Sequence, residues 1–191
     1  MKWIVIIIVL IIGPYTYVTL RYRKPGPAFQ PYDDLKKRAN VSRLLEAGYR
    51  RISITAQRPA DGARARGGAV VTTAAGGLPP ELRSTLVEVP MLPTQITSVT
   101  AAPTANTLQP YTIQLTCTLP NDKQQLGGAE LYIRGDSIVI TPTFEATGGL
   151  QARAPQAEVF LTIPAGAIAS GVYSVTLVGE RASQTWPLDV K

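Results

Sequence analysis

The sequence contains no histidine, the side chain that most often serves as a general base, a metal ligand or a switch near neutral pH. Its one cysteine, Cys117, lies between Leu115 and Leu119 in an alternating stretch, which places the thiol on an apolar face, buried and unreactive. The acidic pair Asp33-Asp34 suits the first turn of a helix better than paired acid–base chemistry. Phosphate-binding, dinucleotide-binding and EF-hand patterns are absent. We therefore expect a protein that is not an enzyme, with no catalytic, cofactor-binding or metal-binding residues.

Basic side chains are then the groups that could bind a partner, and they are concentrated in one segment. The whole chain carries a net charge of +6. Residues 21–66, which we call the basic collar, hold twelve Lys and Arg against four Asp and Glu, whereas residues 67–191 hold six against nine. A basic segment beside a membrane is attracted to anionic lipid headgroups. Nucleic acid is not an expected partner, because no aromatic platform accompanies the positive charge.

An apolar stretch precedes the collar. Residues 3–20 are uncharged, and a helix of that length reaches roughly 27 Å, close to the hydrocarbon thickness of a bilayer. Residues 15–20 lack the small-residue pattern of a signal-peptidase site, so we expect an uncleaved transmembrane anchor over residues 1–22. The charges that follow favour the bacterial inner membrane with the soluble part in the cytoplasm, and the alternative is a domain that faces the periplasm.

The residues predicted to contact the membrane interface, anionic headgroups or other membrane-protein subunits are Trp3, Tyr15, Tyr17, Arg21, Arg23, Lys24, Lys36, Lys37, Arg38, Arg43, Arg50 and Arg51.

Residues 23–60 are predicted to form a basic membrane-proximal segment with one short amphipathic helix, 34–47, and one strand, Tyr49–Ala56. Gly48 is expected to end the helix in the left-handed conformation. Three settings fit the helix: the headgroup layer of a membrane, a partner subunit, or the protein's own sheet. Residues 61–83 are rich in Gly and Ala and are expected to form a connector.

From residue 84 onward the pattern has period two, with turn residues every eight to twelve positions, which indicates an antiparallel sandwich over residues 84–191. Gly127-Gly128 is expected to be a hairpin turn, and Arg134-Gly135-Asp136 a tight turn rather than an adhesion motif. The predicted strands are Ser84–Val89, Ile96–Ala101, Tyr111–Leu119, Glu130–Arg134, Ser137–Thr141, Glu158–Ile163, Val172–Val178 and Thr185–Val190.

The last fifty residues carry a resemblance to a known fold. The stretches Val159–Gly166, Gly171–Gly179 and Trp186–Val190 are similar to the closing strands of bacterial immunoglobulin-like or fibronectin-like sandwich domains. The resemblance implies that Tyr173 occupies the position of a tyrosine corner. It implies a fold and no activity.

The sequence thus predicts a fold class: a single N-terminal transmembrane helix followed by a mainly β soluble domain, an immunoglobulin-like antiparallel sandwich, with one short amphipathic helix. The expected function is that of a non-catalytic accessory or scaffolding subunit of a multi-subunit membrane complex, such as a photosynthetic or respiratory one. The layout resembles that of the H subunit of photosynthetic reaction centres. The alternative is a membrane-anchored binding or assembly module that faces the periplasm.

Overall fold

The computed structural model describes residues 12–17, 21, 31–59, 64–119, 121, 123–146 and 155–191. The chain divides into two compact units, Met1–Leu35 and Lys36–Lys191. In the first unit, residues 12–17 are helical.

The predicted transmembrane helix is not found in the described residues, where no helix is both long and apolar enough to cross a membrane. The fold class predicted from the sequence is therefore wrong in naming a membrane-spanning helix. Residues 3–11 and 18–20, the rest of the predicted span, lie outside the described residues.

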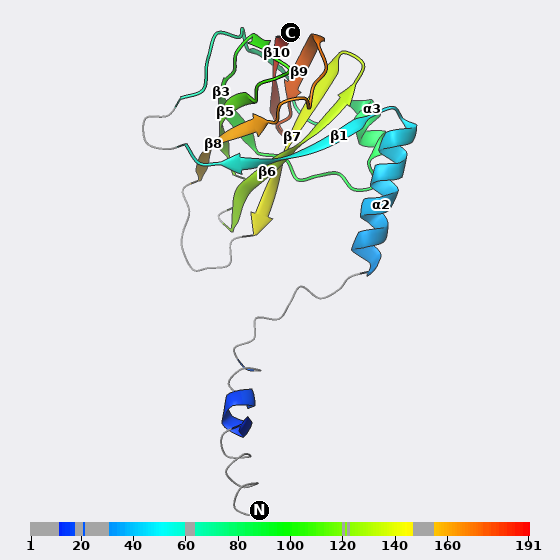
Figure 1. Cartoon of the computed structure of the whole chain (residues 1–191), viewed down its shortest axis with the longest axis vertical. Helices are drawn as coiled ribbons and strands as arrows, with labels where there is room; N and C mark the ends of the chain where they lie inside the picture. Colours follow the sequence, from blue (N-terminus) through cyan, green and yellow to red (C-terminus); the bar gives the residue numbers. More distant parts are fainter. Residues whose placement is uncertain are drawn as a thin grey trace, which may run out of the picture. The chain divides into compact units, whose positions relative to one another are not determined.

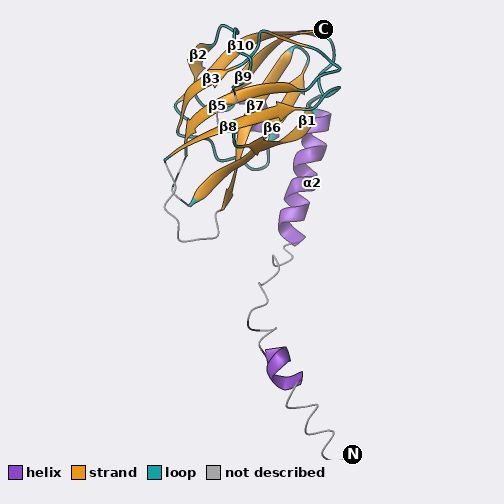
Figure 2. Cartoon of the chain, turned by 60° about the vertical axis from the view of Figure 1, so that its left-hand side comes forward, coloured by secondary structure: helices purple, strands orange, loops and turns teal. Residues whose placement is uncertain are grey.

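The second unit contains a single mixed sheet that curls into a half-barrel (Figures 1 and 2). In the described part of the chain, nine strands follow the order β2-β10-β9-β7-β6-β1-β8-β5-β3, and β4 pairs with β10 beside this path. Most neighbours are antiparallel, whereas β7 with β9 and β10 with β4 are parallel. The strands are β1 (Arg50–Gln57), β2 (Thr72–Ala75), β3 (Gln95–Thr100), β4 (Thr104–Ala105), β5 (Tyr111–Thr118), β6 (Gln124–Arg134), β7 (Ser137–Ala146), β8 (Gln156–Ile163), β9 (Gly171–Leu177) and β10 (Ala182–Val190).

The main core lies inside this curled sheet. Alternate residues of β5 point inward, so that Ile113, Leu115 and Cys117 are fully buried while the residues between them are half-buried. Trp186 of β10 and Leu161 of β8 join the same cluster. The predicted two-sheet sandwich is therefore wrong: one sheet encloses the core by curling, and no second sheet faces it in the described residues.

A smaller cluster covers the outer face of the sheet over β6 and β7. It is built from the helices α2 (Pro31–Glu46) and α3 (Pro80–Thr85), which contribute Leu44 and Leu82 to a contact with Tyr132 and Val139. Strand geometry explains the two clusters, because neighbours of Tyr132 in β6 point to the opposite face, into the main core. The sheet thus has an apolar layer on both faces at β6 and β7.

Helix α2 begins at Pro31 and ends at Glu46, close to the predicted 34–47. Gly48 ends it with φ of 78°, as predicted. The amide of Tyr49 donates to the carbonyl of Leu44 and that of Gly48 to Leu45, at 2.8 and 3.0 Å, the pair of bonds that defines a Schellman motif.

The segment predicted to be a connector contains two elements, β2 and α3, and α3 replaces the first part of the strand predicted at Ser84–Val89. Pro80 stands at the start of α3, and the hydroxyls of Ser84 and Thr85 bond back to the Glu81 carbonyl. A second difference concerns Gly127-Gly128, which lies inside β6 at an irregularity and not in a turn. Any Cβ at Gly128 would collide with the Ile54 carbonyl of β1.

Other strand predictions agree with the structure, although β6 and β7 are longer than expected. The tight turn at Arg134-Gly135-Asp136 is confirmed, with Gly135 at φ of 58°. The residues that carried the immunoglobulin-like resemblance form parts of β8, β9 and β10. The Tyr173 hydroxyl donates to the Ala169 carbonyl at 3.1 Å. Tyr173 nevertheless lies in a single mixed sheet and not in the two-sheet sandwich that the resemblance implied.

Candidate functional site

Metal-ligating side chains and the single cysteine are the groups of the described residues that bear most directly on a chemical role. These residues contain no group of three or more acidic or thiol side chains that could hold a metal ion. Cys117 is fully buried in the main core, and this burial raises the pKa of its thiol to about 11. A thiol that stays protonated at neutral pH and is closed off from solvent is a poor nucleophile. The candidate sites are therefore surfaces and cavities that could bind a partner.

The structure separates the predicted contact residues into three groups. Trp3, Arg23 and Lys24 lie outside the described residues. Tyr15, Tyr17 and Arg21 belong to the first unit, where Arg21 donates to the Tyr17 hydroxyl at 2.9 Å. Lys36, Lys37, Arg38, Arg43, Arg50 and Arg51 belong to the second unit.

The basic residues of the second unit differ in their hydrogen-bond and ion-pair partners. Arg51 forms a bidentate contact with the Glu130 carboxylate through Nε and Nη2, at 2.7 and 2.9 Å. This hydrogen bonding raises the pKa of the Arg51 guanidinium. Arg50 donates to the Ala167 carbonyl, and Lys36 pairs with Glu88 at 3.9 Å. Lys37 and Arg43 lie exposed on α2.

A groove between α2 and β1 combines exposed apolar side chains with this positive charge. Val41 and Leu45 are 44% and 66% exposed, although their neighbour Leu44 is buried in the outer cluster. Lys37, Val41 and Leu45 recur every four residues and therefore lie along one face of the helix. The groove has a volume of about 350 Å³. Its lining residues, which define the α2 groove, are Val41, Leu44, Leu45, Tyr49, Arg50, Arg51 and Ser53.

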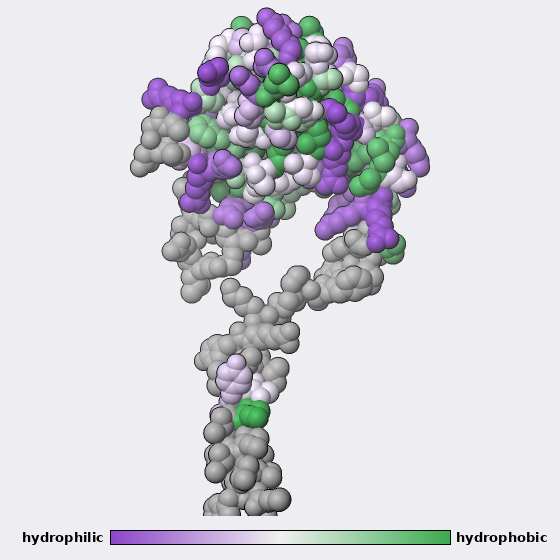
Figure 3. All heavy atoms as spheres, viewed as in Figure 1, coloured by the Kyte–Doolittle hydropathy of each residue, from purple (hydrophilic) through white to green (hydrophobic). Residues whose placement is uncertain are grey.

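No acidic side chain is among these lining residues, although the Glu130 carboxylate beside the groove accepts hydrogen bonds from both Arg51 and Ser53. Figure 3 shows apolar and polar surface side by side on the side where Figure 1 places α2. The floor is held in place by Tyr49, which contacts Leu44 in the outer cluster and carries the Arg134 guanidinium 4.7 Å from its ring centre. The α2 groove is thus a preformed apolar surface with one cation, Arg50, that has no acidic partner among the lining residues.

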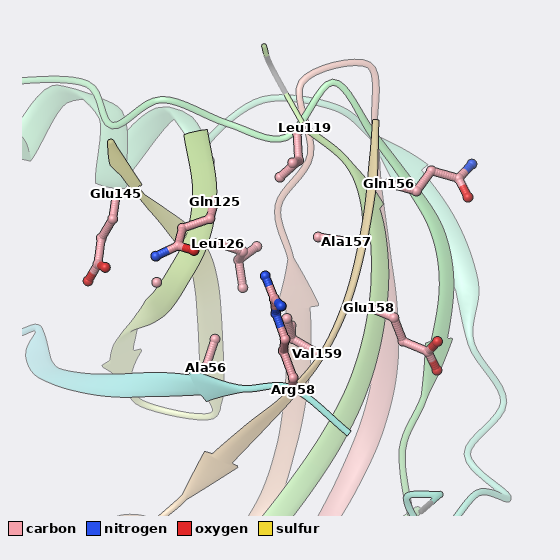
Figure 4. Close-up of a pocket in the computed structure, with 11 residues that line it drawn as sticks. Ala56, Arg58, Leu119, Gln125, Leu126, Glu145, Gln156, Ala157, Glu158 and Val159 are labelled. Atoms are coloured by element: carbon pink, nitrogen blue, oxygen red, sulfur yellow. The ribbon is translucent and has the colours of Figure 1, made fainter. Parts of the chain in front are cut away.

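A second hollow, of about 560 Å³, lies where the sheet divides (Figure 4). β1 pairs with β6 through Arg50–Thr55 and with β8 through Ala56 and Gln57, so a cavity lies between the first residues of β6 and β8. Arg58 points into it, whereas the carboxylates of Glu145 and Glu158 point away on either side (Figure 4). Its walls therefore carry both signs of charge.

In a third hollow, also of about 560 Å³, the charged lining side chains are all positive. We call it the Arg64 cavity; its charged lining residues are Arg64, Arg66 and Lys191, and no acidic side chain lines it.

Sequence reasoning did not single out Arg58, Arg64 or Arg66, although the collar included them. Sequence reasoning also did not decide whether the apolar face of α2 contacts a membrane, a partner subunit or the protein's own sheet. The packing of Leu44 shows that the helix uses the protein's own sheet, while Val41 and Leu45 stay exposed. These three arginines follow a predicted strand that ends at Ala56, in a segment with few acidic residues. That position is the sequence signal that could have marked them as candidate binding residues.

The chain was compared with protein-family models, curated proteins and solved structures, and none of these comparisons found a match. The immunoglobulin-like resemblance and the expected membrane location therefore stay predictions.

Proposed function

We propose that this protein is a non-catalytic accessory subunit that binds a partner protein through the α2 groove. The partner segment is expected to carry apolar side chains flanked by acidic ones. The observation that carries the proposal is the row Lys37, Val41 and Leu45 on α2, exposed beside the lining residues Arg50 and Arg51.

Apolar contact would supply most of the affinity. Neighbouring exposed apolar side chains on a fixed surface commonly mark an interaction site. Burying a Val or Leu side chain contributes about 1.5 to 3 kcal/mol. Because Leu44 and the Schellman motif already hold α2 in place, binding would not have to order the helix first.

Positive charge would select the partner. Two cations line the groove, Arg50 and Arg51, and Glu130 pairs with Arg51. Arg50 donates to a neutral partner, the Ala167 carbonyl, so its charge is the one that an acidic residue of a bound segment would complement. An anionic lipid surface offers the same charge, but a concave groove with apolar side chains on its floor fits a polypeptide segment better than a flat layer of headgroups.

The test is affinity purification of the full chain in mild detergent, with Val41→Asp and Leu45→Asp combined in one variant. We expect a partner to co-purify with the unchanged chain and to be reduced at least tenfold with the variant, because two acidic groups would replace the apolar contacts. Binding should also weaken, without being lost, as salt is raised from about 50 to 300 mM, because salt screens the charge contribution and leaves the apolar one.

Leu108→Asp is the matched control, because Leu108 is 85% exposed and does not line the groove. It should retain the partner. A monomer without partners, or a partner retained equally by the α2 variant, contradicts the proposal. Binding of the chain only to vesicles with anionic lipid, lost in the same α2 variant, would replace the protein partner by a membrane surface.

A further inference from the structure

The Arg64 cavity gathers three cations from two distant parts of the chain. Arg64 and Arg66 follow β1, and Lys191 follows β10. The polar and aromatic residues that share the lining with them are Thr104, Asn106, Gln109, Tyr111, Thr112 and Phe160. No Asp or Glu is among the lining residues, although residues 67–191 have more acidic than basic residues.

Hydrogen bonds hold the backbone segments from which these cations extend. The amide of Ala65, between the two arginines, donates to Gln114 Oε1 at 3.0 Å. Further along the segment, the amide of Ala69 donates to the Ala101 carbonyl at 3.0 Å. The amide of Lys191 donates to the Ala105 carbonyl, also at 3.0 Å. The backbone that carries the three charges is therefore positioned before any ligand arrives, which lowers the cost of binding.

We propose that the Arg64 cavity binds an anion that carries a phosphate group. Like charges that line one cavity repel each other, and an anion bound between them offsets that repulsion. Each guanidinium presents a planar fork of N–H donors, so two arginines and a lysine offer more donors than the two oxygens of one carboxylate can use. A phosphate group, with two charges and three terminal oxygens, suits this donor set better.

The size of the cavity indicates a ligand larger than phosphate itself. Its volume of about 560 Å³ lies in the range of small-molecule sites. Phe160 and the side chains of Thr104 and Thr112 could contact the part of the ligand that carries the phosphate. This site is separate from the α2 groove and does not depend on the proposed function, since the two share no lining residue.

The test is titration of the full chain at constant ionic strength with inorganic phosphate and, separately, with phenyl phosphate. Calorimetry gives the affinity, and amide chemical shifts give the location. We expect saturable binding with shifts at residues 64–66 and 104–112. Tighter binding of phenyl phosphate shows that the rest of the cavity takes part, whereas equal affinities show that the phosphate group alone is recognised.

The variant that combines Arg64→Gln and Arg66→Gln should weaken binding at least tenfold. Arg181→Gln removes one exposed positive charge away from the cavity and should leave the affinity unchanged. Circular dichroism checks that each variant is folded. Binding that is not saturable, that survives the double variant, or that falls equally in Arg181→Gln contradicts the proposal.

Discussion

Cys117 is fully enclosed by the main core, between strands β3 and β8 that pair with β5 on either side. The sequence predicted this burial from the alternation of Leu115, Cys117 and Leu119, and the structure confirms it. Burial without a nearby positive charge disfavours the thiolate, so the pKa of the thiol rises to about 11. The thiol therefore links folding to pH in the alkaline range.

We expect the free energy of unfolding to fall as pH rises from about 9 to about 11, the interval between the ordinary and the folded pKa of the Cys117 thiol. In this interval the unfolded chain releases the proton and the folded chain keeps it, so the stabilisation present below pH 9 is lost. The loss due to this thiol is about 2 to 3 kcal/mol. Urea denaturation at several pH values measures it.

Cys117→Ala is the control for that measurement. The Tyr111 hydroxyl is also buried, which raises its pKa to about 12, and it contributes its own loss at higher pH. The alanine variant should be less stable at neutral pH but should show a flatter decline between pH 9 and 11. Parallel curves for the two proteins would show that the thiol does not titrate as described.

Gly48 is a second residue whose role can be isolated. Its φ of 78° lies in the left-handed region, and a Cβ there would meet no atom within 4 Å. Gly48→Ala should therefore cost only the backbone strain, about 1 to 2 kcal/mol in the free energy of unfolding. Gly48→Asn should cost less, because asparagine adopts this conformation more readily. Thermal unfolding measures both, and equal losses would rule out backbone strain as the cause.

At the scale of elements, α2 could be predicted because its end was marked by Gly48 and its polar and apolar residues follow a helical period. Helix α3 was missed, because Ser84–Val89 contains β-branched residues and followed a stretch rich in Gly. The signal that indicates a helix there is the spacing of Leu78, Leu82 and Leu86, four residues apart, all of which are buried in the outer cluster.

Gly127-Gly128 shows why turn signals alone cannot fix strand ends. Two adjacent glycines indicate a hairpin turn in sequence. In the structure Gly128 is needed where β1 passes close to β6, and β6 continues through it. Such a close approach depends on a strand more than 70 residues earlier in the chain, as the pairing of Thr55 with Gly128 shows.

At the scale of the whole molecule, the period-two pattern predicted a β protein but not its architecture. A sandwich and a curled sheet both place alternate residues in a core, so their strands have the same pattern. The decisive feature is the strand order, in which β1 pairs with β6 and then with β8 and so joins two groups of strands into one sheet. The local sequence of each strand does not indicate this strand order.

The distribution of charge was visible in the sequence, but the sites it forms were not. Cations of the basic collar line each of the three hollows described above: Arg50 and Arg51, Arg58, and Arg64 with Arg66. Lys191, which lines the Arg64 cavity, lies outside the collar. Its contribution arises from the pairing of β10 with β4, which brings the end of the sequence beside Ala105.

The two apolar clusters on opposite faces of β6 and β7 should unfold together. Tyr132 points into the outer cluster and its neighbours Leu131 and Ile133 into the main core, so losing one cluster removes support from strands that the other needs. Leu82→Ala, at a fully buried position of α3, should lower the free energy of unfolding by about 2 to 5 kcal/mol.

The measurement compares two signals during denaturation of that variant. Fluorescence of Trp186, buried in the main core, reports on the inside of the sheet, and Trp3→Phe removes the other tryptophan of the chain. Far-UV circular dichroism reports on α2 and α3 in the outer cluster. A shared midpoint, shifted equally for both signals, is expected for one cooperative unit. A helical signal lost at lower denaturant, with the Trp186 transition unmoved, would mean that the outer cluster unfolds by itself and that the α2 groove can open without disturbing the sheet.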